Sequence, residues 1–512
     1  MTRSSAPTTP TTRSRPPSVD WFIFVVGAVT LFAVVLPIVI APQASATVID
    51  GLFGFLTADL GIVYILVALA TFIFLLWLSF SKWSRLVLGG DSTKPAYSNF
   101  SWAAMLFCTG IGAALIYWGA MEWVYYYVAP PYGIPAQSDA AVTWAASYGV
   151  FHWGPIGWSL YCLPAIAMGC SFHLHGLPNL RLSTACSGVL GDYTGRWPGR
   201  VIDLLFIFGL LGTSATGLGL GTSVVAAALT EVTGIANDFS LQLGVIVAIT
   251  LLVAFSVFRG LNRGIRVLST VNASLALALV AFVFLVGPTL FIMEMGVVAL
   301  GHVVQNFVTM ATWTDPLGQA EFVESWTVFY WAWWIALGPF VGMFVCKISA
   351  GRTIRQVIFG MLGWGSLGCG LFFIVLGNFA LFTHLEGGMD VVGMVQADGP
   401  ATAIARLLAT LPAGEFWLLY VAVVGLIFAA TTYDSAAYTL AAGATRELHE
   451  SAHPARWHRL FWAFTLGFLP AALLFLGGLQ VLQTASIVAS LPLTLIYVVM
   501  AVSIVRLLRQ LP

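Results

Sequence analysis

Long apolar runs dominate the chain and predict membrane-spanning helices. The runs are about 20 residues or longer, the length that crosses the hydrocarbon core of a bilayer as an α-helix. They do not alternate strictly between apolar and polar positions, so helices are favoured over a transmembrane barrel. We place twelve spans near residues 21–42, 59–80, 101–125, 140–170, 201–231, 240–258, 266–300, 324–346, 354–383, 414–443, 460–478 and 484–505.

The basic residues support this count. Of the 21 Lys and Arg residues, all but Arg406 lie before the first span, in alternate loops or after the last span. Cytoplasmic loops are enriched in Lys and Arg. The pattern therefore predicts an even number of spans in the inner (plasma) membrane, with both termini cytoplasmic.

The composition agrees with a membrane protein and narrows its partners. Hydrophobic residues make up 59% of the chain and charged residues 8%, and the mean hydropathy is +0.92, whereas soluble domains carry about 25% charged residues. The formal net charge is zero and no basic patch suggests a nucleic-acid partner. Residues 1–19 are rich in Ser, Thr and Pro, which predicts a disordered cytoplasmic tail.

Glycine and proline interrupt two of the predicted spans. Gly110-Ile111-Gly112 lies within the third span and Gly338-Pro339 within the eighth, five spans later. Small residues and proline also serve helix packing, but transporters with inverted repeats place their sites at interrupted helices in matching positions. We therefore predict hinges at Gly110, Gly112 and Gly338. The corresponding division is two leading helices at 20–100, a repeat of spans 3–7 at 101–305 and a repeat of spans 8–12 at 306–508.

Aromatic residues concentrate in the fourth and eighth spans. Trp158 and Tyr161 are three residues apart and share a helix face. Trp153 precedes them, and Trp334 lies too near the middle of its span for an interfacial belt. A quaternary ammonium group has no N–H donor, but ring faces attract it by about 0.5–2 kcal/mol each. Several indoles near the midplane therefore predict an onium-binding cage.

Few other groups in the spans carry chemistry. Glu122 and Asp434 are intramembrane acids and thus functional candidates, although Glu122, near the outer end of its span, is expected to snorkel or cap. We interpret His152 as a packing or hydrogen-bonding residue. An intramembrane enzyme is disfavoured because there is no His-Glu-x-x-His motif and Ser435 has no histidine base in its helix register. A channel or an osmosensor is the other alternative.

Three stretches resemble the betaine–choline–carnitine transporter family: residues 151–161, 326–343 and 348–355. The resemblance covers nearly the whole chain. It implies an all-α membrane protein of twelve helices, with a LeuT-type 5+5 inverted repeat after two leading helices. It also implies a homotrimer in membrane lipid and the activity of a secondary transporter.

The resemblance also assigns a substrate site. The substrate would be a quaternary ammonium or sulfonium compound, and the chain carries Leu337 where some betaine carriers place a further aromatic. The residues implied are Trp153, Trp158, Tyr161 and Trp334, with Tyr117 and Trp118 facing them.

A coupling ion is implied in the same way. In sodium-dependent members the matching ligands are backbone carbonyls at Cys108, Ile111 and Phe428 and hydroxyls at Thr431 and Thr432. A membrane threonine often bonds its own helix instead. Sodium-independent exchangers place an arginine in the seventh span, where this chain has Asn272. We therefore expect Na+ as the coupling ion, with no organic cofactor. The alternative is a sodium-independent exchanger of carnitine-like compounds, whose sequences the stretch 117–127 resembles.

Overall fold

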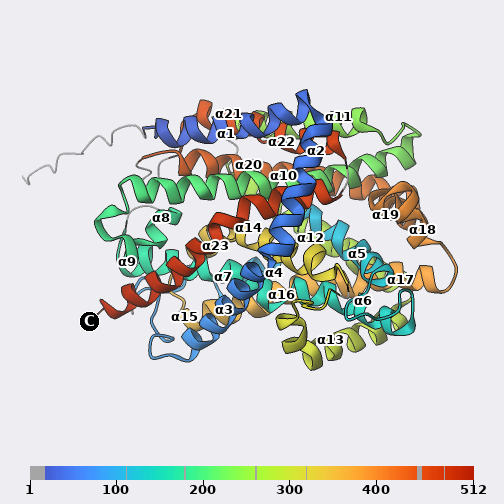
Figure 1. Ribbon diagram of the computed structural model, residues 1–512, viewed down its shortest axis with the longest axis horizontal. Coiled ribbons are helices and arrows are strands. Elements are labelled where there is room, and N and C mark those ends of the chain that lie inside the picture. Colours follow the sequence, from blue (N-terminus) through green and yellow to red (C-terminus); the bar gives the residue numbers. More distant parts are fainter. Residues whose placement is uncertain are drawn as a thin grey trace, which may run out of the picture.

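The computed structural model describes residues 18–90, 92–110, 112–177, 180–259, 262–318, 320–446, 453–477 and 479–511. In these residues the chain is helical, and extended backbone pairs only in two isolated bridges, Val19 with Thr445 and Val87 with Thr353. Most of the long helices run along the long axis of the molecule (Figure 1).

The helices of the first half are α1 Trp21–Ile40, α2 Pro42–Gly54, α3 Gly61–Phe80, α4 Asn99–Thr109, α5 Ala113–Val128, α6 Asp139–His152, α7 Pro155–Gly169, α8 Leu182–Ala185, α9 Ser187–Leu190, α10 Trp197–Thr233 and α11 Phe239–Arg259. Those of the second half are α12 Asn262–Val286, α13 Thr289–Thr312, α14 Phe329–Ile348, α15 Ile354–Gly360, α16 Ser366–Phe372, α17 Asn378–Leu385, α18 Val391–Asp398, α19 Pro400–Ala409, α20 Gly414–Gly443, α21 Arg456–Thr465, α22 Phe468–Leu476 and α23 Leu479–Arg509. Short π-helical segments extend or join several of them, at Phe55–Asp59, Cys170–Leu174, Val323–Val328, Met361–Gly365 and Phe373–Gly377.

Eleven helices of the described chain are long and apolar enough to cross a membrane, and a bent pair brings the number to twelve. The prediction of an all-α, multi-pass membrane protein is confirmed. The predicted seventh span, 266–300, is wrong in its bounds, because α12 ends at Val286 and a separate α13 begins at Thr289. Pro288 lies at this joint, and a proline disfavours helical backbone in the residue before it.

The third span is interrupted where its glycines predict. α4 ends at Thr109, α5 begins at Ala113, and the two halves are bent by 57°. A membrane helix broken in this way leaves backbone N–H and C=O groups free inside the protein.

The break predicted in the eighth span is absent, and this prediction is wrong. Helix α14 continues through Gly338-Pro339 from Phe329 to Ile348. Pro339 has no N–H for the carbonyl of Ile335. The hydroxyl of Tyr497, on α23, lies 3.2 Å from Ile335 O and 2.7 Å from Leu160 O and shares its one proton between the two carbonyls.

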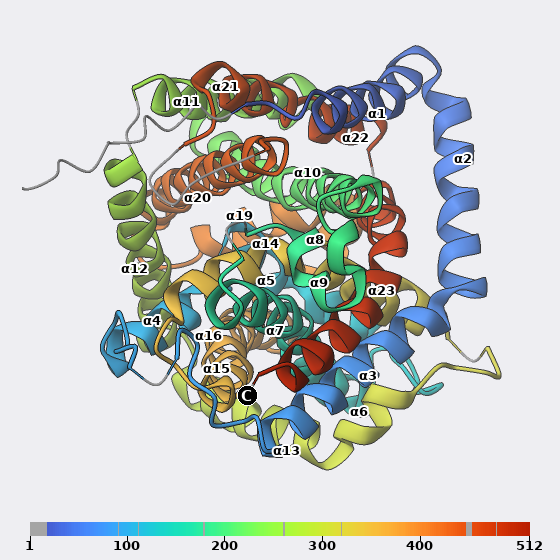
Figure 2. The ribbon, with the colours of Figure 1, turned by 90° about the vertical axis from the view of Figure 1, so that its left-hand side faces the viewer.

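The helices that carry the predicted site lie inside the molecule. In Figure 2, α5, α7 and α14 are surrounded by α10, α20, α3 and α6. α7 packs directly against α14, and α10 against α20 and α23. The glycines of α10 permit this approach, since a Cβ on Gly212 would lie 2.8 Å from the carbonyl oxygen of Ala485.

Candidate functional site: an aromatic cage

The fourth span changes direction at Trp153. α6 ends at His152 and α7 begins at Pro155, so Trp153 lies in a short joint between two helices. Its N–H still donates to Gly149 O at 3.1 Å, which anchors it to α6. Trp158 and Tyr161 follow on α7, on one helix face. Because Trp153 lies in this joint, its ring is not held on the face that helical spacing alone would give it.

The structure brings the four predicted cage rings together. Trp334, on α14, lies with its ring centroid 4.9 Å from that of Trp153 and 4.6 Å from that of Tyr161, at interplanar angles of 86° and 70°. Trp158 lies 5.5 Å from Tyr161 at 84°. All four side chains are buried. Edge-to-face packing of this kind fixes the rings against one another, so the cage is preorganised by α7 and α14.

Two indole N–H groups of the cage are open to a ligand: that of Trp334 has no hydrogen-bond partner among the described residues, and that of Trp158 has only the weak acceptor Cys369 Sγ beside it. An unpaired buried donor costs about 1–3 kcal/mol. A substrate oxygen near the cage can accept from either group. The cage therefore combines ring faces for an onium head with donors for a polar tail.

Close approach to the cage explains one glycine of the third span. A Cβ on Gly110 would lie 2.6 Å from Cys369 Sγ and 2.8 Å from Cζ2 of Trp158. Gly112 differs, because no atom of the described residues lies within 4 Å of its Cβ position. Its φ of −152° and ψ of 177° are open to any residue. Of these two glycines, Gly110 alone supports the cage by its lack of a side chain.

Substitution of these two glycines should show that Gly110 needs to lack a side chain and that Gly112 does not. We expect Gly110→Ala to displace Trp158, at an overpacking cost of about 1–3 kcal/mol, and to raise the substrate KM about tenfold. Gly112→Ala is the matched control and should change KM less than about twofold. Uptake by the two variants in proteoliposomes is the measurement. Equal KM values would contradict the close-approach role of Gly110.

Tyr117 and Trp118 lie in a neighbouring aromatic cluster. Trp118 is 5.0 Å from Tyr117, 5.8 Å from Trp326 and 5.9 Å from Tyr330. In the described chain no ring contact joins either residue to the four cage rings. Tyr330 links the two groups, since its centroid is also 6.0 Å from that of Trp153.

The residues predicted to hold sodium are placed only in part. Ile111 lies outside the described residues, and Cys108 is half-buried on the last turn before the break. On α20, Phe428 and Thr431 are buried and Thr432 is exposed. Thr431 Oγ1 donates to the carbonyls of Ile427 (2.9 Å) and Phe428 (3.1 Å), which leaves its lone pairs free.

Asn272 is buried on α12 and reaches α20. Its Nδ2 donates to Val424 O at 3.2 Å, and its Oδ1 has no partner among the described residues. Val424, Phe428 and Thr431 are spaced four and three residues apart and share a face of α20. The neutral amide therefore lies beside the helix predicted to hold the ion.

Residues 22–512 match the family of betaine/carnitine/choline transporters. The chain belongs to this family. It is 33% identical over 492 residues to a carnitine transporter of Acinetobacter baumannii. The aligned residues cover 96% of this chain and 89% of that protein. A glycine betaine transporter of Bacillus subtilis is 33% identical over 497 residues (96% and 94%), and an ectoine/hydroxyectoine transporter of Virgibacillus pantothenticus is 32% identical over 493 residues (95% and 96%).

As a member of this family the chain is a multi-pass membrane transporter and not an enzyme, as the sequence predicts. The structure adds cage neighbours to those named from the sequence. Phe373 has its ring centroid 5.6 Å from Trp153, and the indole of Trp153 donates from Nε1 to Glu122 Oε2 at 3.3 Å. Tyr330 could have been found from the sequence, because it precedes Trp334 by four residues on one helix face. No sequence pattern indicated Phe373, which lies in the ninth span.

The expectation that Glu122 snorkels or caps at the outer surface is wrong. Its side chain is 1% exposed and accepts hydrogen bonds from Tyr126, Tyr330 and Trp153. His152 is a hydrogen-bonding and packing residue as predicted, with Nε2 3.2 Å from Thr327 Oγ1 and its ring stacked on Tyr330 at 4.8 Å.

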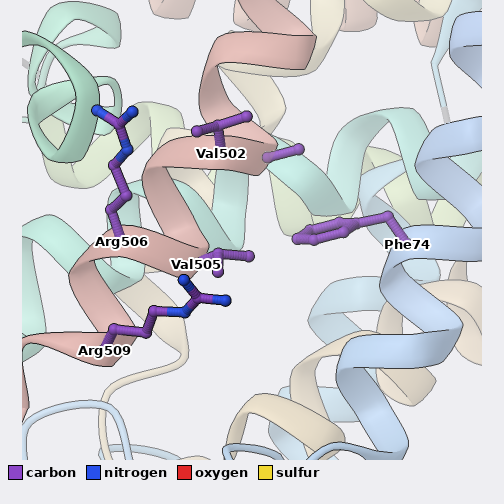
Figure 3. Close-up of a pocket in the computed structure, with 6 residues that line it drawn as sticks. Phe74, Val502, Val505, Arg506 and Arg509 are labelled. Carbon is purple, nitrogen blue, oxygen red and sulfur yellow. The ribbon is translucent and has the colours of Figure 1, made fainter.

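Two open cavities of this transporter lie apart from the cage. A groove of about 320 Å³ lies between α3 and α23, where Phe74 on α3 lies across from Val502, Val505, Arg506 and Arg509 on α23 (Figure 3). A second cavity, of about 290 Å³, is lined by charged residues that include Asp20, Asp203 and three arginines. No cage residue lines either of these cavities, and the four cage rings are buried.

Proposed function

We propose that this transporter is a sodium-coupled symporter of a quaternary ammonium compound, working by alternating access. The observation that carries the proposal is the buried cage of Trp153, Trp158, Tyr161 and Trp334. Ring faces attract a cation that cannot be hydrogen-bonded, and the indole N–H groups open to a ligand can receive a carboxylate or hydroxyl. Betaine, choline and carnitine share this design of an onium head with an oxygen-bearing tail.

Sodium coupling is supported by the α20 residues and by Asn272. Hard cations prefer oxygen ligands, and the carbonyl of Phe428 and the hydroxyl of Thr431 supply two on one buried face. The seventh span supplies no fixed positive charge there, because Asn272 is neutral. One Na+ entering down an inside-negative potential of 100 mV contributes about 2.3 kcal/mol, which can drive accumulation of a zwitterionic substrate.

We extend the proposal to the architecture. The break between α4 and α5 opens a first five-helix repeat (residues 101–305), and a second (306–508) includes α14, after two leading helices. This is the LeuT-type arrangement, in which the broken helix faces the coupling ion. We also propose a homotrimer in the inner membrane. Both termini would be cytoplasmic, because the basic residues alternate between loops.

Uptake into proteoliposomes tests the transport proposal. Labelled glycine betaine, choline and carnitine are supplied with and without an inward sodium gradient. We expect uptake of at least one compound to rise about tenfold or more with sodium, since one charge that crosses a potential of 100 mV contributes about 2.3 kcal/mol, or about fiftyfold in an equilibrium. Uptake that ignores sodium and needs a counter-substrate inside would establish the exchanger instead. Absence of uptake of all three under both conditions would contradict the substrate class.

A further inference from the structure

A buried carboxylate lies directly behind the cage. Glu122, on α5, accepts from Trp153 Nε1 at 3.3 Å and from the hydroxyls of Tyr330 and Tyr126. The indole N–H can only donate and both tyrosine hydroxyls can donate, so the ionised form satisfies every one of these bonds without a proton of its own. Hydrogen bonds to a carboxylate are about twice as strong as those between neutral groups.

The neighbouring histidine can remain neutral in this network. Tyr126 has a single hydroxyl proton and gives it to Glu122 Oε1. With Glu122 ionised, His152 Nδ1, 3.0 Å from that hydroxyl oxygen and 3.8 Å from the carboxylate, is then the donor to Tyr126. Its Nε2 then accepts from Thr327 at 3.2 Å. In the described chain no Lys or Arg pairs with Glu122, so in its ionised form Glu122 is the one charge of the cluster.

We propose that Glu122 is a specificity-determining residue that supplies the cage with its negative charge. This inference rests on the proposed transport of an onium compound. The charge lies one indole away from the onium head, in a site closed to water where charges interact far more strongly than in solvent. The Trp153 N–H bond to the carboxylate also draws electron density toward the ring, which strengthens its attraction for a cation.

The same residue positions the cage. Its bonds join α5, the α6–α7 joint and α14, which are the three elements that approach the onium site. Tyr330 is one helical turn from Trp334 on α14. A purely positional role and a charge role make different predictions, because only the charge distinguishes a cation from an uncharged molecule of the same shape.

Binding of choline and of its uncharged isostere, 3,3-dimethylbutan-1-ol, tests the inference. Affinities are measured by calorimetry and by competition on the full-length protein in lipid nanodiscs. We expect Glu122→Gln to weaken choline binding about tenfold or more and to change that of the isostere less than about twofold. Glu324→Gln is the matched control: Glu324 lies at the start of the eighth span and its carboxylate bonds no cage residue, so neither affinity should change.

Each other result is decisive. Equal losses for both ligands, or no loss for either, would overturn the charge role. If the wild-type protein binds no onium compound, the proposed function falls and this inference with it; if it binds and the selectivity of Glu122→Gln is unchanged, this inference alone falls. Where Glu122→Gln does not fold, Tyr126→Phe removes one donor to the carboxylate and should shift the same affinity ratio about threefold in the same direction.

Discussion

Replacement of Trp334 by leucine is expected to weaken onium binding at least about thirtyfold, because a desolvated cation–π contact contributes about 2 kcal/mol. The indole lies 4.9 Å from Trp153 and 4.6 Å from Tyr161. Its loss removes one ring face and also loosens the two rings that pack edge-to-face against it. Binding of glycine betaine, choline and carnitine by calorimetry, together with KM for uptake, is the measurement.

Two variants control this prediction. Trp334→Phe keeps a ring face and should lose only about three- to tenfold, since Phe attracts cations less well than Trp. Trp364→Leu removes a tryptophan whose side chain is 45% exposed on the outer surface, and it should leave affinity unchanged. If Trp334→Leu binds as tightly as Trp364→Leu does, the cage is not the substrate site.

The spans and the cage were predictable because both depend on local patterns. Apolar length defines a membrane helix whatever its neighbours are, and the spacing of Trp158 and Tyr161 places them on one face of any α-helix. The break at Gly110 was predictable too. Its structural reason was not, because Trp158 and Cys369 approach it from other helices.

The remaining features depend on partners far along the chain. The hydroxyl of Tyr497 keeps α14 continuous at Pro339, and no property of the eighth span indicates this. Glu122 was misread because α5 is buried on nearly all sides, so its sequence has no lipid-facing stripe from which depth could be judged. An acid near a predicted span end can equally be exposed or buried. Here the three hydrogen-bond donors around Glu122 show that it is buried.

Substitution of Asn272 by arginine is expected to abolish sodium dependence. The side chain reaches Val424 O on α20, one turn before Phe428. An arginine there would place a guanidinium beside the predicted ion ligands, repel Na+ and itself supply the positive charge. We expect the sodium gradient to stimulate uptake by the Asn272→Arg variant less than about twofold, against about tenfold or more for the wild type. Initial rates across a range of sodium concentrations give the comparison.

Neutral substitutions distinguish charge from packing at this position. Asn272→Leu has the same branching at Cγ and should keep sodium dependence, because it adds no charge. Since a buried arginine can also destabilise the fold, the α20 ligand gives an independent check. Thr431→Ala removes a proposed sodium ligand and should raise the sodium concentration for half-maximal uptake about tenfold, whereas Thr431→Ser keeps the hydroxyl and should behave as wild type. The two variants act on the same face of α20 by opposite means, because one adds a charge and the other removes a ligand. If sodium dependence survives both in a folded Asn272→Arg protein and in Thr431→Ala, the ion binds elsewhere.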